Sequence, residues 1–136
     1  MIQKAAFSLE HYFFDKVNIN LDNYNNKEYQ IKFDPKGVFN KEEMVYTLNF
    51  CFSAKCDEIE DNFVTINCIG RFKFTDINTI ENIPPYFYRN SIAILFPFLR
   101  GFLSMVTIQA NVPPILLPAM NLTALEKPLS ENTKEE

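Results

Sequence analysis

The side chains that could carry out acid–base or nucleophilic chemistry are few in this chain of 136 residues. His11 is the only histidine, and it has no evident serine or cysteine nucleophile to activate. The carboxylates of Asp57, Glu58, Glu60 and Asp61 lie together, a pattern more typical of a solvated turn than of a paired acid and base. Glycine is too scarce to suggest a phosphate-binding loop. We therefore predict that the protein is not an enzyme and that it binds no cofactor.

The cysteines Cys51, Cys56 and Cys68 are the remaining candidates for a metal site or a disulfide. The N-terminal residues Met1-Ile2-Gln3-Lys4 lead into no long apolar segment of a secretory signal, so we expect a cytoplasmic protein with reduced thiols. Cys51 and Cys56 are an odd number of residues apart and would face opposite sides of a regular strand. A metal site is therefore not predicted.

Charge and aromatic content limit the classes of partner. The formal net charge is −4 and the pI is near 5.0, which argues against a nucleic-acid partner. Fourteen Phe and six Tyr are a heavy aromatic load for a chain of this length. Two interpretations stay open: the rings fill a large core, or some of them form a surface that contacts another molecule.

Four segments of alternating polarity are predicted to be strands. They are Phe7–Leu21, Glu28–Asp34, Met44–Lys55 and Phe63–Phe74, and the second is expected to end at Pro35. In the first segment, Tyr12-Phe13-Phe14 would put aromatic rings on both faces, which predicts either a β-bulge or cover on both sides. Strands in succession followed by helix predict an α+β fold, with an antiparallel sheet whose apolar face meets the helix.

A long apolar helix is predicted over Pro84–Ala110, opened by two prolines and kinked at Pro97. Its apolar residues cover more than one side, so the helix has to be buried on several sides. A small sheet covers only one of them, which favours a helix at a subunit interface. A membrane span is the alternative that the length permits. Arg100 argues against it, because a charge at the membrane centre costs about 2.5–3.5 kcal/mol.

The C-terminal part is predicted to be irregular apart from one short helix. Prolines hold Asn111–Ala119 extended, although this segment carries three large aliphatic residues. Asn121 is a suitable N-cap for a helix over Leu122–Lys127 that Pro128 ends. Residues 130–136 form a polar, acidic tail that we expect to be disordered.

The long helix and the segment after it resemble the signature of SecB, the protein-export chaperone of bacteria. The residues that carry the resemblance are Ile94-Leu95-Phe96-Pro97-Phe98, Arg100, Pro113-Pro114, Leu117, Pro118, Asn121 and Ala124-Leu125. Weaker similarity reaches back to Phe7 and implies a SecB-like domain over residues 1–129. The resemblance implies a four-stranded antiparallel sheet followed by a long kinked helix and a short C-terminal helix. It also implies a homotetramer, a dimer of dimers with the long helices between sheets.

The SecB family holds unfolded precursor proteins before export, without ATP, in hydrophobic grooves on the tetramer surface. By similarity, the client-binding groove falls on Tyr29, Ile31, Phe33, Ile115, Leu117, Leu122 and Leu125. Subunit contacts are expected at or near Phe96, Phe98, Leu99 and Phe102. For each of the groove side chains, packing in the subunit core is the alternative.

Three positions depart from the export chaperones, which present acidic residues on the sheet to the translocase motor SecA. This chain has Lys16, Asn20 and Thr65 there, so we predict weak or absent SecA binding. Two alternatives to general export stay open. One is a SecB-like chaperone dedicated to one client, such as an antitoxin. The other is a non-chaperone oligomeric module that binds a small apolar ligand. We expect neither nucleic-acid binding nor membrane insertion.

Overall fold

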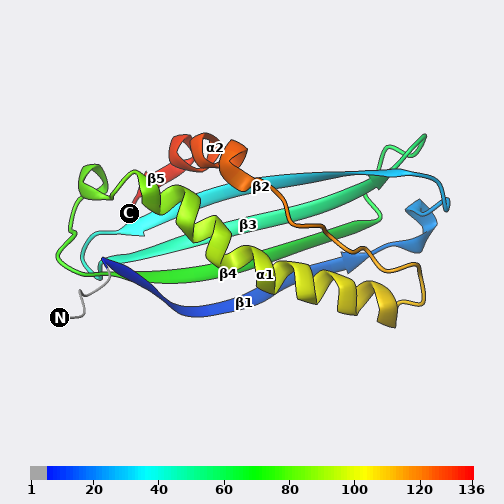
Figure 1. Ribbon diagram of the computed structural model, residues 1–136, viewed down its shortest axis with the longest axis horizontal. Helices are drawn as coiled ribbons and strands as arrows, with labels where there is room; N and C mark the ends of the chain where they lie inside the picture. The colour runs from blue at the N-terminus through cyan, green and yellow to red at the C-terminus, as the bar shows by residue number, and fades with distance from the viewer. Residues whose placement is uncertain (1–5) are drawn as a thin grey trace.

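The computed structural model describes residues 6–136, and the segment Met1-Ile2-Gln3-Lys4 discussed above lies outside the described residues. The strands are β1 (Phe7–Ile19), β2 (Tyr29–Asn40), β3 (Val45–Cys56), β4 (Val64–Phe74) and β5 (Thr133–Glu135). The helices are α1 (Tyr86–Gln109) and α2 (Glu126–Glu131), with 3₁₀ turns η1 (Leu21–Asn23), η2 (Ile80–Asn82) and η3 (Leu122–Leu125). Figure 1 shows one sheet with α1 running diagonally across one face.

The predicted α+β class is confirmed, but the sheet differs from the expected four antiparallel strands. The strand order is β1-β4-β3-β2-β5, with antiparallel pairing from β1 through β2. β5 adds a fifth strand, which pairs in parallel with β2. The described sheet is therefore mixed.

The fifth strand corrects the prediction that residues 130–136 are disordered. α2 ends at Glu131, and the chain then pairs with the edge of β2. Leu129, just before the tail, is fully buried and anchors it. The carboxylate of Glu135 accepts a hydrogen bond from the Ile80 N–H (3.2 Å) and lies 3.6 Å from the Lys41 ammonium. The acidic composition of the tail gave no indication of these contacts.

Two prolines do not end the elements that they were expected to end. Pro35 lies inside β2 opposite Phe50. The N–H of Gly37, two residues on, points outward to the Asn132 carbonyl, so the Pro35 nitrogen also faces the outer edge and no ladder bond is lost. Pro128 lies in the first turn of α2, where the N–H has no intrahelical partner. α1 likewise runs through Pro97 without interruption.

β1 carries two bulges. A bulge was one of the two alternatives that the aromatic residues Tyr12-Phe13-Phe14 suggested. The pairing with β4 shifts between Leu9 and His11 and again between Phe14 and Lys16. The extra residues are Glu10 and Asp15, which let apolar side chains on both sides of each bulge face the helix.

One face of the sheet and the inner side of α1 form the core. Phe87 of α1 is fully buried and packs edge-on against Tyr46 and Phe72, with ring centres 4.7 and 5.5 Å away. Farther along α1, Ile92, Leu95, Leu99 and Leu103 are also fully buried. Gly70 of β4 lies beneath Leu95, where an added Cβ would come within 3.0 Å of the leucine side chain. This glycine lets the helix lie close to the sheet.

By length and composition, α1 is the one described helix that could cross a membrane. Its inner side is part of the core, which favours the interpretation as a core helix over a membrane span.

Candidate binding groove

The free end of β2 presents a row of three large side chains on the helix face of the sheet. Alternate residues of a strand point to one face, which aligns Tyr29, Ile31 and Phe33. Tyr29 is 40% exposed, and the other two are half-buried. Among the described residues no strand pairs with the outer side of this end, because β5 begins opposite Gly37. We name these three residues the β2 row.

Core aromatic rings hold the β2 row in place. The Phe33 ring stacks on Phe50 with ring centres 5.4 Å apart and meets Phe96 of α1 edge-on at 6.2 Å. The Tyr29 ring packs edge-on against the buried Phe63 at 5.6 Å. One side of each ring is thus fixed while the remainder stays accessible, which suits a preformed binding surface.

The proline-rich segment alternates between the core and the surface. Ile115 and Leu117 are 2% and 3% exposed, whereas Leu116 between them is 68% exposed. Thr107 of α1 fixes this register, because its Oγ1 accepts a hydrogen bond from the Ile115 N–H (3.0 Å). Ile115 and Leu117, expected in the groove, are therefore core residues. Leu116 is the accessible one; the two-residue period of an extended segment sets it apart from Ile115 and Leu117 but does not tell which side faces inward.

The turn η3 supplies the two other predicted groove residues. Leu122 and Leu125 are half-buried and pack against the core. Asn121 caps the turn, since its Oδ1 accepts hydrogen bonds from the Thr123 N–H (3.1 Å) and hydroxyl (2.7 Å). In Figure 1 the segment between α1 and η3 crosses the same face of the sheet as α1, towards β2.

The outer side of α1 is a second apolar surface. Its exposed members are Ile94 (37%), Phe98 (38%), Met105 (51%) and Ile108 (55%), which we name the α1 outer face. Of the residues expected at subunit contacts, Phe98 lies here, stacked on Tyr12 of β1 at 4.1 Å. Phe102 is half-buried and stacks on Phe14 at 4.0 Å.

Two of the expected contact residues lie elsewhere. Leu99 is fully buried and Phe96 is 7% exposed, both within the subunit itself. Met105 and Ile108 were not among the expected contact residues, although the helical period from Ile94 and Phe98 points to them. A hollow of about 410 Å³ lies beside the α1 outer face, lined by Pro97, Arg100, Gly101, Ser104 and Leu116.

The open face of the sheet, opposite α1, holds two of the positions compared with SecA-binding residues. Lys16 and Thr65 line a hollow of about 230 Å³ together with Asp34, Lys36 and Asn67 among others. Asn67 donates to Asp15 (2.7 Å) and Asn49 (2.6 Å) through its Nδ2. Asn20 instead caps η1 by accepting from the Asp22 N–H (3.0 Å). This part of the open face mixes both signs of charge and is not an acidic patch.

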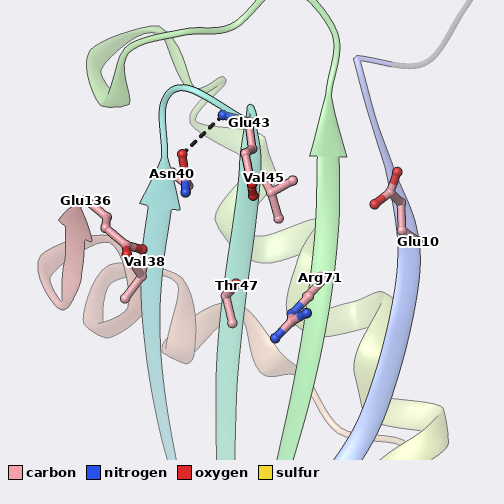
Figure 2. A pocket seen from close by; sticks show the side chains of 8 residues that line it. All are labelled: Glu10, Val38, Asn40, Glu43, Val45, Thr47, Arg71 and Glu136. Atoms are coloured by element: carbon pink, nitrogen blue, oxygen red, sulfur yellow. Dashed lines mark hydrogen bonds between the residues drawn. The ribbon is translucent and has the colours of Figure 1, made fainter.

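A second hollow on the open face surrounds Arg71 of β4 and measures about 350 Å³ (Figure 2). Glu10, Glu43 and Glu136 lie around it, and Val45 and Thr47 form part of its floor. The Arg71 guanidinium lies 5.6 Å from the centre of the Phe13 ring. A lone cation among carboxylates has no evident nucleophile or acid–base pair to work with.

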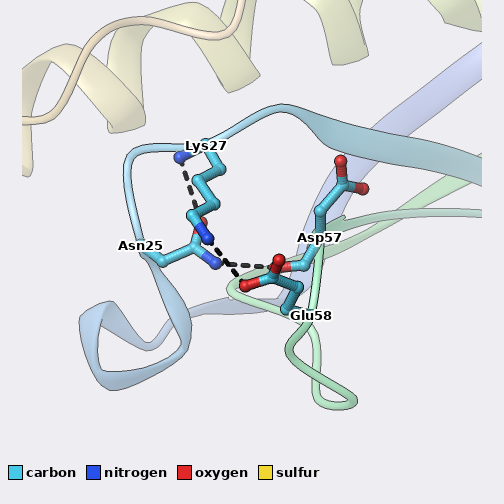
Figure 3. A network of polar contacts seen from close by, with 4 residues as sticks. All are labelled: Asn25, Lys27, Asp57 and Glu58. Carbon is cyan, nitrogen blue, oxygen red and sulfur yellow. Dashed lines mark hydrogen bonds and ion pairs between the residues drawn. The ribbon is translucent and has the colours of Figure 1, made fainter.

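The acidic turn at residues 57–61 has a structural role (Figure 3). The Lys27 ammonium pairs with the Glu58 carboxylate at 2.6 Å, and Asn25 Nδ2 donates to the Asp57 carbonyl at 2.6 Å. The Lys27 N–H donates to Asn25 Oδ1 (3.0 Å). These contacts join the loop before β2 to the turn after β3.

The cysteines are free thiols, with Cys56 and Cys68 buried and Cys51 half-buried. Burial, with a smaller contribution from Asp15, raises the pKa of Cys68 to about 12, and burial also raises the pKa of Cys51. Thiols of this kind are mostly protonated near neutral pH. Within residues 6–136 no three His, Cys, Asp or Glu side chains are grouped to hold a metal ion.

The sheet, the diagonal helix and the short C-terminal helix together form the fold of the SecB-like chaperones. The particular structure that shows this is the Mycobacterium tuberculosis SecB-like chaperone Rv1957 in complex with a ChAD peptide from the Rv1956 HigA1 antitoxin. It aligns with a TM-score of 0.71 and 12% sequence identity, over 85% of this chain and 88% of that chain. The resemblance to SecB is thereby confirmed at the level of the fold.

Sequence comparison gives one curated relative, an uncharacterized protein of Methanocaldococcus jannaschii, MJ0357. It is 31% identical over 78 residues, which is 54% of this chain, and the match spans 50% of the length of that relative. A solved protein of unknown function from Streptococcus agalactiae aligns with a TM-score of only 0.40, at 18% identity over 83% of this chain and 97% of that chain. No family profile matches the chain.

Proposed function

We propose that this protein is a cytoplasmic, ATP-independent holdase that binds unfolded client proteins along the β2 row and η3. The observation that carries the proposal is the β2 row itself. Tyr29, Ile31 and Phe33 lie side by side at one edge of the sheet, and each is partly packed against the core or its rings and partly exposed.

Burial of apolar surface is non-directional and yields about 25 cal/mol per Å². A row of partly exposed apolar side chains can therefore accept many sequences and release them without a nucleotide. The exposed Leu116 adds a further apolar contact on the proline-rich segment.

The α1 outer face supports assembly as a homotetramer. Ile94, Phe98, Met105 and Ile108 lie on one side of α1, and chain 6–136 itself leaves them exposed. Contact between the outer faces of two copies would bury them, and the resemblance to SecB implies a dimer of dimers.

The open face of the sheet favours a chaperone dedicated to one client over a general export chaperone. Lys16 and Thr65 line this face, and the resemblance to SecB matches them to positions where export chaperones present acids to SecA. The M. tuberculosis neighbour was solved with an antitoxin peptide, which makes an antitoxin one candidate client. A toxin–antitoxin gene pair beside the gene for this protein would support that choice.

The proposal is tested by the aggregation of an unrelated denatured protein, followed by light scattering without nucleotide. The parent should slow aggregation, and the double variant Tyr29→Ser/Phe33→Ser should do so several-fold less well. Val38→Ser/Tyr86→Ser is the matched control, because it removes exposed apolar side chains outside the groove. Equal activity of the two double variants would mean that the groove lies elsewhere. No activity in the parent, together with tight binding of a small apolar ligand, would favour the ligand-binding module.

A further inference from the structure

Part of the outer edge of β2 already carries an added strand. β5 pairs there in parallel: the Gly37 N–H donates to the Asn132 carbonyl (3.1 Å), and the Phe39 carbonyl accepts from the Glu136 N–H (2.8 Å). Both Gly37 and Phe39 thus direct their backbone groups outward. Because this direction repeats every second residue, the outward groups at the other end of β2 belong to the β2 row, Tyr29, Ile31 and Phe33.

Pro35 separates the occupied part of the edge from the free part. It has no N–H to donate, and among the described residues no strand pairs outside the β2 row. An unpaired edge of this kind is a template for another strand. The free backbone groups and the partly exposed apolar side chains therefore belong to the same three residues.

The two edges of the sheet differ in how well they accept a strand. β1, at the opposite edge, is interrupted by bulges at Glu10 and Asp15, devices that discourage pairing. β2 pairs with β3 without a register shift from Tyr29 to Asn40, so its free end is regular. The regular edge is the one that carries the β2 row.

We infer that a client segment binds as an added strand, which pairs with Tyr29–Asp34 on the same edge of β2 as β5. This inference rests on the proposed holdase function. The occupant is an extended peptide segment with apolar side chains at every second position. One of its faces packs beside Tyr29, Ile31 and Phe33, and the other, beside Gln30, Lys32 and Asp34, is polar. Backbone bonds supply sequence-independent affinity, while the apolar period fixes the register.

The backbone bonds are tested with a fluorescent eight-residue peptide in which Val or Phe alternates with Thr or Glu, measured by anisotropy. Two versions carry N-methyl groups on the apolar or on the polar positions. An added strand points only one of these sets of N–H groups at β2, the apolar set if antiparallel and the polar set if parallel. We expect one version to bind at least tenfold more weakly and the other to bind within about threefold of the unmethylated peptide. Equal affinity of the two versions would overturn the inference.

Variants of Ile31 make the matching test on the protein. Ile31→Pro and Ile31→Ala both alter the groove side chain, but only proline removes the outward N–H, and Pro35 shows that this edge of β2 accepts proline. We expect Ile31→Pro to bind the peptide at least threefold more weakly than Ile31→Ala, with both variants folded by circular dichroism. If they are folded and bind equally, the edge is not used. If Ile31→Pro fails to fold, the N-methylated peptides decide the matter alone.

The two proposals fail in different ways. Tight but methylation-insensitive binding of the peptide would leave the holdase groove standing and remove strand addition. Absence of any binding by the unmethylated peptide and by denatured proteins would remove the groove, and strand addition with it.

Discussion

The hydroxyl groups of Tyr46 and Thr133 lie 2.6 Å apart and join β3 to β5 across β2. Thr133 in turn donates to the Leu129 carbonyl (2.7 Å), so the tyrosine hydroxyl is the donor to Thr133. Gly37 of β2 leaves the space for this contact, since a Cβ there would lie 1.7 Å from the Tyr46 oxygen. These two hydrogen bonds, which start from the buried Tyr46, thereby fix β5 to the sheet.

Replacing Thr133 should therefore destabilise the protein. Thr133→Val leaves the buried Tyr46 hydroxyl without its partner, at a cost of about 1–3 kcal/mol in the free energy of unfolding by urea. Ser130→Ala is the control, because that hydroxyl donates only to the Lys127 carbonyl at the surface. Equal stability of the two variants would show that the hydroxyl contact between Tyr46 and Thr133 does not stabilise the fold.

Stability should fall at alkaline pH. Burial raises the pKa of Cys68 from its ordinary 9.0 to about 12, so the folded state holds the thiol proton more tightly than the unfolded state does. This contribution is complete below pH 9 and is lost as the pH rises towards 12. Burial also raises the pKa of Tyr46, so this residue likewise loses its contribution to stability at alkaline pH.

The urea midpoint measures this effect. It should be constant up to about pH 8.5 and should fall progressively above that. The decline should be shallower in Cys68→Ala, which lacks the thiol. A midpoint that is unchanged at about pH 10.5 would contradict the assignment of Cys68 and Tyr46 as buried neutral groups.

The α1 outer face should control assembly. We expect a tetramer by light scattering at micromolar concentration, and Phe98→Asp/Met105→Asp should convert it to smaller species because two charges would enter an apolar contact. Ser53→Asp, on the open face of the sheet, should leave the mass unchanged. A monomeric parent would remove the argument that α1 is covered by another copy.

Binding to SecA should be weak or absent. By the resemblance to SecB, Lys16 would put a positive charge where SecA meets an acidic residue of the export chaperones, and like charges at an interface can cost several kcal/mol. Titration with SecA from the same host at low salt gives the answer. A submicromolar affinity that falls with added salt would contradict this prediction and favour a general export chaperone.

Much of the fold was predictable because its strongest signals are periodic. Alternating polarity located four strands, and the run from Pro84 to Ala110 located α1 to within two residues of its bounds. β5 was not predictable from its composition. It pairs through backbone groups and one hydroxyl, and its charges interact with Lys41 and the Ile80 N–H, which are distant in sequence.

The groove was predictable only in part. The two-residue period placed Tyr29, Ile31 and Phe33 on one face, and the structure leaves these three partly accessible. In the proline-rich segment, the sequence has three adjacent aliphatic residues and no sign of which ones face inward. A tertiary contact, the bond from the Ile115 N–H to Thr107, decides that Ile115 and Leu117 are buried and Leu116 is exposed.

Photo-crosslinking tests the central claim, client binding at the β2 row, most directly. A photoreactive amino acid placed at Tyr29 or at Thr65 would be exposed to a urea-denatured protein on dilution. These two positions lie on opposite faces of the sheet. We predict strong crosslinks from position 29, competed by unlabelled denatured protein, and few from position 65. Equal crosslinking from the two positions, or crosslinking from position 65 alone, would contradict the account.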